Sequence, residues 1–242
     1  MKLLIIRHAD PDYTIDSLTP TGWNEARLLS DRLSRLDVKA FYVSPLGRAK
    51  DTASLTLKKM NREAAECEWL REFPSRIFRP DQEAETIAWD WLPADWTNEP
   101  RHYDKDAWHT TEIMAAGQVA EEYQRVTREF DKLLSLHGYD REGGYYRAVR
   151  ANHDTIILFC HFGLECVLLS HLLGVSPMVL WHGTCAAPSS VTTLVTEERR
   201  DGIACFRISS FGDVSHLYAA GEQPSFAARF CETFGDEDQR HD

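Results

Sequence analysis

The chain has 242 residues, and 43% of them are apolar, which is enough for one α/β domain of medium size with a substantial core. The formal net charge of −11 argues against nucleic acid and anionic membrane surfaces as partners. The apolar run at the N-terminus stops at Arg7, too early for a signal peptide or a membrane span, and no other stretch is long enough to cross a bilayer.

The apolar run at residues 1–6 predicts a short strand that is buried on both faces and ends at Arg7 and His8. Ligands of open α/β sheets bind at the carboxyl ends of the strands. There a guanidinium can grip two oxygens of an anion while an imidazole attacks or donates a proton. Taken alone, such a pair is more often a polar cap on a strand that reaches the surface, so the rest of the chain decides.

A helix is expected after this strand, because Thr19 can cap it and Pro20 suits its first position. A second strand over residues 38–43 leads into Ser44, and a second helix begins near Leu46. Apolar residues at helical spacing give each helix one buried face. These are Trp23, Ala26, Leu29, Leu33 and Leu36 in the first helix, and Ala49, Ala53, Leu57 and Met60 in the second.

The middle of the chain is less regular. A short strand is expected around residues 66–70, and the segment 73–111 that follows has no clear period. A long helix from about residue 111 to residue 136 then precedes a loop rich in Gly and Tyr at 137–146. The irregular segment contains Trp89, Trp91, Trp96 and Trp108 together with Pro74, Pro80, Pro93 and Pro100.

The last part of the chain predicts a strand over residues 155–160 and a helix over 164–173. Two further strands, 190–196 and 203–209, are joined by a short charged turn and therefore form an antiparallel hairpin. This order of elements predicts an α/β fold of three layers, with helices on both faces of a mostly parallel sheet that has an antiparallel edge. The polar residues 236–242 are expected to be a frayed, charged tail.

Arg and His follow the parallel-type strands at the points where these strands end. Arg7 and His8 follow the first strand, Arg48 comes shortly after the second, and His161 follows the strand at 155–160. Because parallel strands place their carboxyl ends at one edge, these side chains are expected to converge there, beside the N-terminus of the next helix. Cations and aimed N–H groups of this kind suit a phosphoryl group, and one imidazole would be free to attack it.

These residues stand in motifs that resemble the histidine phosphatase superfamily, branch 1, which has the phosphoglycerate-mutase-like fold. The match of the Ser-Pro-x-x-Arg-Ala-x-x-Thr-Ala segment is complete and specific, and the resemblance spans most of the chain outside 73–111. The matching segments are Arg7-His8-Ala9, Leu18-Thr19-Pro20-Thr21-Gly22, Ser44-Pro45-Leu46-Gly47-Arg48-Ala49-Lys50-Asp51-Thr52-Ala53, Cys160-His161-Phe162-Gly163 and Ser215-His216-Leu217.

The resemblance implies a role for each matched residue. His8 would be the nucleophile that becomes phosphohistidine, and Arg7, Arg48 and His161 would bind the phosphoryl oxygens. The general acid of the family falls on Glu72, within Leu70-Arg71-Glu72, although an exposed Glu in this charged stretch would need no function. The resemblance also implies one domain over residues 1–235, with a Trp-rich cap inserted at about 73–111.

The sequence departs from the family pattern at several points. Ala9 replaces a Gly, which would cost about 1 kcal/mol if the position needed a positive φ. Phe162 replaces another Gly and is expected to narrow the pocket wall; it also stands where the acid phosphatase branch has Asp. After Glu72, Phe73-Pro74-Ser75-Arg76 stands in place of the mutase sequence Glu-Arg-His-Tyr-Gly, which weakens an assignment as a mutase.

The Trp-rich segment lies where the family varies the part that faces the substrate. Two interpretations are equally favoured: an apolar wall or lid for the organic part of the substrate, or aromatic side chains that fill a side core. In the first interpretation Trp89, Trp91 and Trp96 would contact the substrate, and Arg76, Arg79 or Arg101 would be further anion contacts.

The sequence as a whole predicts a phosphatase that acts on a small phosphorylated metabolite without metal or other cofactor. None of the ten His residues stands in a His-Glu-x-x-His or similar metal-ligand spacing. The six Cys residues form no Cys-x-x-Cys pair, which favours free thiols in a reducing cytoplasm. A mutase-type phosphotransferase and an inactive protein that binds phosphorylated ligands are the alternatives, and a homodimer is left open.

Overall fold

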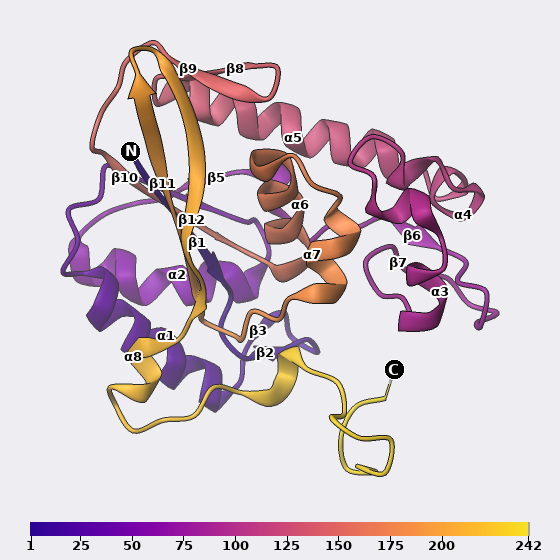
Figure 1. Ribbon diagram of the computed structural model, residues 1–242. Coiled ribbons are helices and arrows are strands. Elements are labelled where there is room, and N and C mark those ends of the chain that lie inside the picture. Colours follow the sequence, from indigo (N-terminus) through magenta and orange to yellow (C-terminus); the bar gives the residue numbers. More distant parts are fainter. Residues whose placement is uncertain (242) are drawn as a thin grey trace.

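The computed structural model describes residues 1–241 and places an eight-stranded sheet at the centre of the molecule (Figure 1). Four neighbouring strands are parallel, and the others add to them in antiparallel pairs. The predicted α/β fold with a mostly parallel core and an antiparallel edge is thus confirmed. In spatial order the strands are β5 (Ala65–Glu66), β4 (Ala40–Val43), β10 (Thr155–Cys160), β1 (Lys2–Arg7), β11 (Val191–Arg200), β12 (Ile203–Asp213), β9 (Tyr145–Ala148) and β8 (Tyr139–Glu142).

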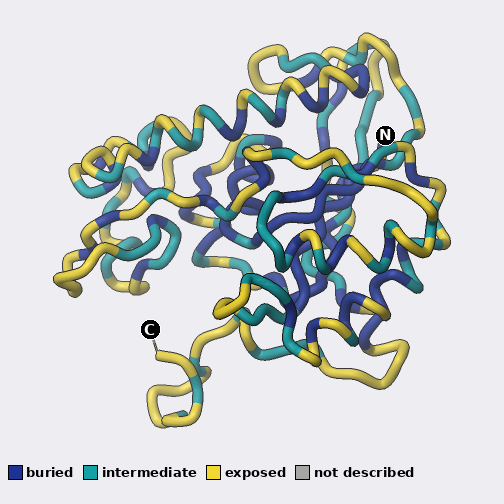
Figure 2. The backbone as a smooth tube through the Cα atoms, turned by 180° about the vertical axis from the view of Figure 1, so that it is seen from behind, coloured by how far each residue is buried: buried dark blue, intermediate teal, exposed yellow. Residues whose placement is uncertain are grey.

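Helices cover both faces of this sheet. Successive side chains of β1 point to opposite faces, and those on each face pack against the helices that cover it. Leu4 and Ile6 pack against α1 (Pro20–Leu33) and α2 (Gly47–Met60). Leu3 and Ile5 belong to the larger core on the other face, under α5 (Val119–Leu136) and α6 (Phe162–Leu173). The central strands accordingly form the most deeply buried part of the chain (Figure 2).

The predicted stripe of α1 is confirmed in its middle but not at its two ends: the helix ends at Leu33, so Leu36 lies beyond it and is partly buried. Ala26, Leu29 and Leu33 are fully buried, whereas Trp23 is 38% exposed. Gly22 takes the buried position instead, one helical turn before Ala26, and a Cβ there would lie only 2.2 Å from the carbonyl oxygen of Asp10. The helix therefore approaches the loop after β1 through a glycine, and the indole is left at the surface.

The stretch 137–146 was expected to be a loop, and this expectation is wrong. It contains β8 and the start of β9, joined by the two-residue turn Gly143-Gly144, in which Gly143 has a φ of +59°. A Gly-Gly pair is one of the sequences that suit such hairpin turns. Tyr139 and Tyr146 anchor the hairpin, because both are buried and pack edge-on against Phe206.

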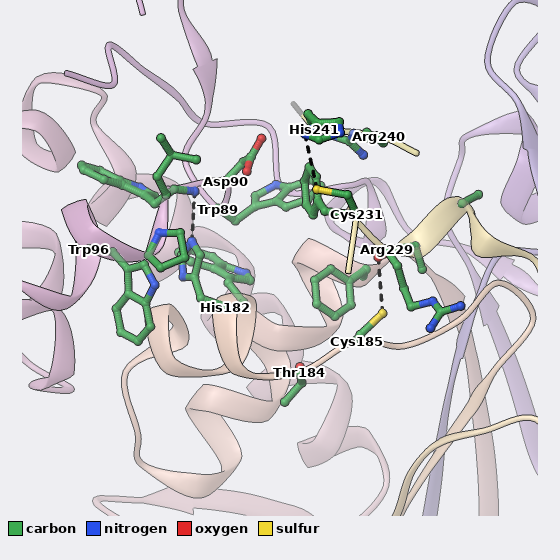
Figure 3. Close-up of a pocket in the computed structure, with 18 of the residues that line it drawn as sticks. Trp89, Asp90, Trp96, His182, Thr184, Cys185, Arg229, Cys231, Arg240 and His241 are labelled. Atoms are coloured by element: carbon green, nitrogen blue, oxygen red, sulfur yellow. Dashed lines mark hydrogen bonds between the residues drawn. The ribbon is translucent and has the colours of Figure 1, made fainter. Parts of the chain in front are cut away.

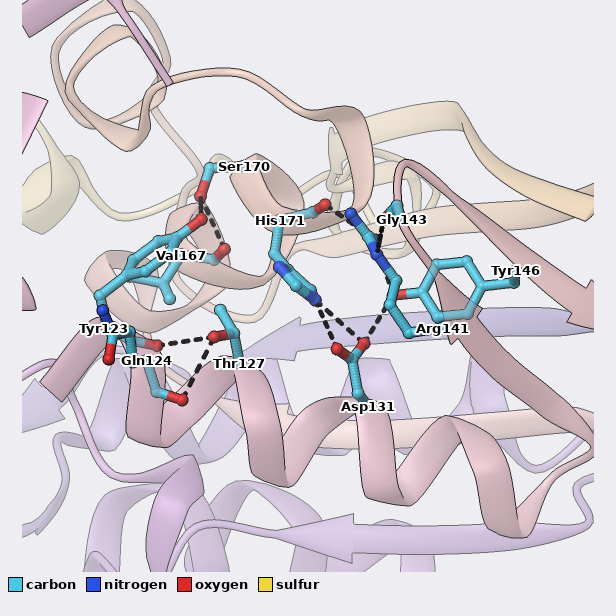
Figure 4. A network of polar contacts seen from close by, with 10 residues as sticks. All are labelled: Tyr123, Gln124, Thr127, Asp131, Arg141, Gly143, Tyr146, Val167, Ser170 and His171. Atoms are coloured by element: carbon cyan, nitrogen blue, oxygen red, sulfur yellow. Dashed lines mark hydrogen bonds and ion pairs between the residues drawn. The ribbon is translucent and has the colours of Figure 1, made fainter. Parts of the chain in front are cut away.

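A polar network fastens the same hairpin to the helices (Figure 4). The carboxylate of Asp131 in α5 accepts a hydrogen bond of 2.8 Å from the hydroxyl of Tyr146 and lies 2.9 Å from Nε2 of His171 in α6. Arg141 completes it by donating to the Tyr146 hydroxyl and to the His171 carbonyl. The edge of the sheet is thereby held against two helices.

The helix expected over residues 111–136 is interrupted. It consists of α4 (Glu112–Ala116) and α5, separated by Gly117 and by Gln118 in the left-handed conformation with φ +51°. A Cβ on Gly117 would lie 2.5 Å from the carbonyl oxygen of Arg76. The glycine at this interruption therefore allows the chain to pass close to the backbone of Arg76. The remaining short elements are β2 (Pro11–Asp12), β3 (Ser17–Leu18), β6 (Arg76–Ile77), β7 (Thr86–Ile87), α3 (Pro93–Thr97), α7 (Pro177–Gly183) and α8 (Ser215–Tyr218).

The strand expected at residues 66–70 is also mostly absent, because β5 ends at Glu66 and a single 3₁₀ turn covers Glu68–Leu70. The six Cys side chains are all free thiols, and Cys160 and Cys166 are buried. None of the helices within residues 1–241 is long and apolar enough to cross a membrane.

The C-terminal segment is joined to the loop after β1. Ser225 donates from its hydroxyl to Asp10 at 2.5 Å and from its backbone N–H to Glu25 at 3.3 Å, and Glu25 also accepts from the N–H of Asp10 at 2.8 Å. Glu25 is only 2% exposed, and burial, with a smaller contribution from the neighbouring Asp10, raises its pKa to about 7.

This junction predicts a pH-dependent stability that Glu25→Gln should remove. Between pH 4.5 and about 7 the folded protein keeps a proton on Glu25 that the unfolded chain releases. The stabilisation that this proton gives to the folded state is therefore present at low pH and is lost as the pH rises through this window. The shift corresponds to about 3 kcal/mol. Urea unfolding at several pH values should show the free energy of unfolding of the wild type falling relative to the variant across this window. A constant difference would contradict the assignment.

Candidate active site

The edge of the sheet where β1, β10 and β4 end brings the two predicted His side chains together. These three strands are parallel neighbours, so His8 and His161, which follow β1 and β10, emerge side by side. Their ring centroids are 5.1 Å apart, and the two residues are 2% and 0% exposed. The convergence predicted for these two residues is what the structure contains.

The contacts of His8 define which of its nitrogens can react. Nδ1 lies 2.8 Å from the carbonyl oxygen of Ala9, and because a carbonyl only accepts, Nδ1 carries the proton. The lone pair of the neutral ring is therefore on Nε2. Burial lowers the pKa of His8 well below its ordinary value, and the positive charges of Arg7 and Arg48 lower it further. The imidazole is thus held in its nucleophilic, unprotonated form.

Near this ring, three side chains each have one buried hydrogen-bond donor atom without a protein partner. They belong to Arg7, Arg48 and His161. Arg7 donates from Nη1 to the carbonyl of Ala186 at 2.5 Å, and Arg48 pairs with Asp16 at 2.6 Å. Both Nε atoms are nevertheless buried and unpartnered. Buried donors without acceptors are costly, so a group that supplies acceptor oxygens would be stabilised here.

His161 contributes one of these unpartnered atoms. Its Nε2 lies 2.8 Å from the hydroxyl of Ser44, which itself accepts from the N–H of Leu46 at 3.3 Å. When Ser44 donates to Nε2, the proton of the neutral ring is on Nδ1, and this buried Nδ1 has no partner. Burial lowers the pKa of His161 well below its ordinary value, and the neighbouring His8 lowers it further, so the ring is a neutral donor.

Glu72 lies at the first turn of α6, the helix that has His161 as its N-cap. Its carboxyl accepts from the backbone N–H groups of Phe73 at 2.9 Å, Leu164 at 2.9 Å and Gly163 at 3.3 Å. Burial is the largest influence on its pKa and raises it above the ordinary value, against these hydrogen bonds and Arg7. The alternative that Glu72 is an exposed surface residue without contacts does not agree with this position.

Gly163 allows Glu72 and the cap to approach α6. A Cβ at this position would lie 2.7 Å from the indole ring of Trp89 and 2.8 Å from Oε1 of Glu72. The family resemblance implies that Glu72 is the general acid, so Gly163→Ala, which should displace it, is expected to lower kcat for alkyl phosphates about tenfold, since misplacement of a reacting group by a fraction of an ångström is costly. Gly144→Ala is the matched control, because a Cβ there meets nothing within 4 Å. An unchanged kcat in Gly163→Ala would contradict the placement of Glu72.

A cavity of about 550 Å³ opens beside this group of residues (Figure 3). It reaches them at Arg7, Glu72 and Phe162, whereas His8, Arg48 and His161 are not among its lining residues. The guanidinium of Arg48 pairs with Asp16, and its carbon lies 5.3 Å from the ring centroid of Tyr13.

The aromatic wall of the cavity consists of Trp89, Trp91, Trp96, Phe162, Trp181 and His182.

The Trp residues of segment 73–111 divide into two sets. Trp89, Trp91 and Trp96, the candidates for substrate contact, line the cavity, whereas Trp108 is fully buried and packs against Trp181, as a core residue does. Arg79 also lines the cavity, yet its guanidinium is bound to Asp81 at 2.6 Å and lies 3.6 Å from Asp90.

Arg76 and Arg101, the other anion contacts considered, are not at the cavity. Arg76 in β6 donates to the carbonyl of Glu85 at 2.7 Å, and Arg101 pairs with Glu99 at 2.7 Å. Both guanidiniums are held by acidic or carbonyl groups close by in the sequence. The structure therefore gives them no part in the cavity.

Two segments that line the cavity were not predicted from the sequence. The first is α7, which contributes Trp181 and His182; the N-cap Ser176 followed by Pro177 is a signal that could have identified this helix. The second is the C-terminal segment, which was expected to fray from residue 236. It folds back instead, so that Arg240 and His241 lie across the cavity from Trp96 and His182 (Figure 3). Asp242 lies outside the described residues.

Two of the departures from the family pattern, Ala9 and Phe162, have simple consequences in the structure. Ala9 is buried and does not have a positive φ, so no backbone strain arises from the missing Gly; its N–H donates to the hydroxyl of Thr52 at 2.9 Å. Phe162 lines the cavity, as expected, with the guanidinium of Arg7 5.7 Å from its ring centroid.

Residues 1–241 hold no group of three or more His, Cys, Asp or Glu side chains that could bind a metal ion.

Within this α/β fold, buried donors of Arg7, Arg48 and His161 that have no protein partner lie around the neutral ring of His8. The model of the histidine phosphatase superfamily, branch 1, matches residues 3–208, and the chain belongs to this family. A curated relative is phosphoserine phosphatase 1 of Hydrogenobacter thermophilus, 25% identical over 223 residues that cover 86% of this chain and 93% of that protein. The family and this relationship show that the chain is a phosphatase enzyme.

Solved structures agree on the fold. A phosphoserine phosphatase of Entamoeba histolytica in complex with 3-phosphoglyceric acid is 19% identical, covers 89% of this chain and 98% of its own, and superposes with a TM-score of 0.57. A mycobacterial glucosyl-3-phosphoglycerate phosphatase in complex with VO3 is 19% identical, covers 87% and 98%, and has a TM-score of 0.53. At these identities the likeness concerns the fold alone.

Proposed function

We propose that this protein hydrolyses a small phosphomonoester through a phosphohistidine formed on Nε2 of His8. The observation that carries the proposal is the set of buried donors without partners, Nε of Arg7, Nε of Arg48 and Nδ1 of His161, around a His whose Nδ1 is already bound. A phosphoryl group supplies acceptors for these donors and presents phosphorus to the free nitrogen.

The first half of the reaction follows from these positions. Nε2 of His8 attacks phosphorus and the ester bond breaks, while Glu72 gives its proton to the leaving oxygen. The two guanidiniums and His161 stabilise the charge on the three equatorial oxygens during the transfer. The raised pKa of Glu72 supports this assignment, because a general acid must hold its proton near the working pH.

In the second half, water attacks the phosphohistidine and Glu72 takes a proton from it. Free phosphate leaves, and Glu72 is protonated again for the next cycle. The positive charge that phosphoryl transfer needs is supplied by guanidiniums and N–H groups, so we infer that the reaction requires neither a metal ion nor another cofactor. The free thiols fit a reducing cytoplasm as the place of action.

A panel of phosphorylated metabolites, scored for released phosphate, tests this function. We expect release from at least one small monoester, no loss of activity after exhaustive treatment with EDTA, and little 2-phosphoglycerate from 3-phosphoglycerate and a bisphosphate primer. Rapid interconversion of the phosphoglycerates, much faster than phosphate release, would show a mutase. Binding of phosphorylated ligands without turnover would show an inactive member of the family.

A further inference from the structure

Three of the four indole N–H groups of the aromatic wall are bound within the protein. Trp89 donates its indole N–H to the carbonyl of Phe73 at 3.1 Å, and Trp91 donates to the carbonyl of Ala88 at 3.1 Å. Trp181 donates to the carbonyl of Gly163 at 2.9 Å. These three donors are therefore occupied within the protein. Trp91 and Trp181 are only 6% and 4% exposed, so among these three rings it is the partly exposed Trp89 that offers a ligand apolar surface.

His182 extends this surface as a neutral ring. Its Nδ1 lies 2.7 Å from the carbonyl of Met178, and its Nε2 accepts from the backbone N–H of Trp91 at 3.1 Å. Burial lowers its pKa to about 4. The ring is stacked on Trp96, with centroids 5.1 Å apart and planes inclined by 22°. Both nitrogens are used, so His182 provides neither a charge nor a free donor.

The charges on the cap side of the cavity do not favour a second anion. Arg79 is the cap cation that lines it, and Asp81 and Asp90 neutralise this guanidinium. Asp90 itself lines the cavity and would repel a carboxylate. On the opposite side, Arg229 pairs with Glu232 at 3.0 Å and lies over the ring of Phe226, and Arg240 lies over the ring of Phe230. Within the described residues 73–111, the cap itself therefore adds to the cavity no unpaired cation that would favour a substrate with a carboxylate next to its phosphate.

We propose that the aromatic wall binds a flat, apolar, uncharged group, and that the enzyme acts on phosphate esters of alcohols that carry such an aromatic group. The inference rests on the proposed function, because Arg7 and Glu72 join the phosphoryl site to the same cavity. The P–O bond to this alcohol breaks, phosphorus bonds to Nε2 of His8, and the alcohol leaves with the proton of Glu72. Water then releases phosphate and restores that proton.

The test compares phosphates of primary alcohols, so that the leaving groups are similar in chemistry. The probes are 2-(2-naphthyl)ethyl, 2-cyclohexylethyl and propyl phosphate, together with phosphoserine and 3-phosphoglycerate. We expect kcat/KM for the naphthyl ester to exceed that for every other probe by about tenfold or more, because ring burial and stacking add to phosphate binding. Equal values for the naphthyl and cyclohexyl esters would overturn the assignment of a flat site.

Two variants of the wall and one control locate the effect. Trp96→Leu and Trp89→Leu should each lower the ratio of kcat/KM for the naphthyl ester over the propyl ester about fivefold or more. Trp23→Leu is the matched control, because Trp23 lies on α1, is 38% exposed and does not line the cavity. An unchanged ratio in both wall variants would overturn the inference.

Binding of unreactive phosphonates separates this inference from the proposed function. Calorimetric titration should show 2-(2-naphthyl)ethylphosphonate binding about tenfold or more tightly than propylphosphonate. If the naphthyl phosphonate binds more tightly but no ester is hydrolysed, the ligand class is supported and the proposed function is wrong. If esters are hydrolysed but phosphoserine or 3-phosphoglycerate is the best substrate, the function stands and this inference fails.

Discussion

His8→Ala should lower kcat by about 10⁴-fold or more, because the variant has no nitrogen to accept the phosphoryl group. Binding of phosphate should survive. The donors of Arg7, Arg48 and His161 belong to other residues, and their contacts with Ala186, Asp16 and Ser44 do not involve the ring of His8. Steady-state hydrolysis of propyl phosphate measures the first effect, and calorimetric titration with inorganic phosphate measures the second.

His153→Ala serves as the control for this prediction, since His153 is exposed and lies with Met1 and Lys2 at the end of β1 opposite to Arg7 and His8. The control should retain wild-type kcat. Turnover by His8→Ala at a rate near that of the wild type would exclude His8 as the nucleophile. Loss of phosphate binding together with turnover would instead place His8 among the groups that hold the anion.

Glu72→Gln should have the second largest effect, and its size should depend on the leaving group. An alkoxide leaves poorly without a proton, so kcat/KM for propyl phosphate should fall by about 10²-fold to 10³-fold. The oxygen of 4-nitrophenyl phosphate leaves as a stable anion, and its rate of transfer to His8 should fall much less. Single-turnover rates for the two substrates measure this difference directly.

The pH profile gives Glu72→Gln a second readout. The acid must be protonated, so the wild-type rate with propyl phosphate should fall as the pH rises through the pKa of Glu72, which burial raises above its ordinary value. This alkaline limb should be absent in Glu72→Gln. The acid limb should remain well below the ordinary range of a His, because burial and Arg7 lower the pKa of His8. An unchanged alkaline limb would assign the proton donor to another group.

Residues that stand at strand ends could be placed from the sequence, because the carboxyl edge of a parallel sheet is fixed by the order of the elements. Apolar runs followed at once by Arg7-His8 and by His161 were sufficient to predict that the two rings meet. The surroundings of Arg48 were predicted less completely than those of the two His residues. Its partner Asp16 lies in the loop after β1, and no local pattern indicates that this carboxylate turns toward the second helix.

The walls of the cavity could be predicted only in part, because they depend on contacts between distant segments. The Trp-rich composition favoured a substrate wall and a side core equally, and nothing in it indicated that Arg79 would be neutralised by Asp81 and Asp90. The return of the C-terminal segment depends on Ser225 meeting Asp10 and Glu25, about two hundred residues away in the chain. Single-sequence periodicity carries no information on such pairs.

The central claim, a phosphoryl group carried on His8, is tested most directly by trapping the intermediate. Wild-type enzyme is mixed with ³²P-labelled substrate for a single turnover, quenched in alkali over a series of times, and digested for mass spectrometry. The account predicts a protein-bound phosphate that is stable in alkali, labile in acid and located on His8. Label on another side chain, or a completed turnover with no protein-bound label at any quench time, would contradict it.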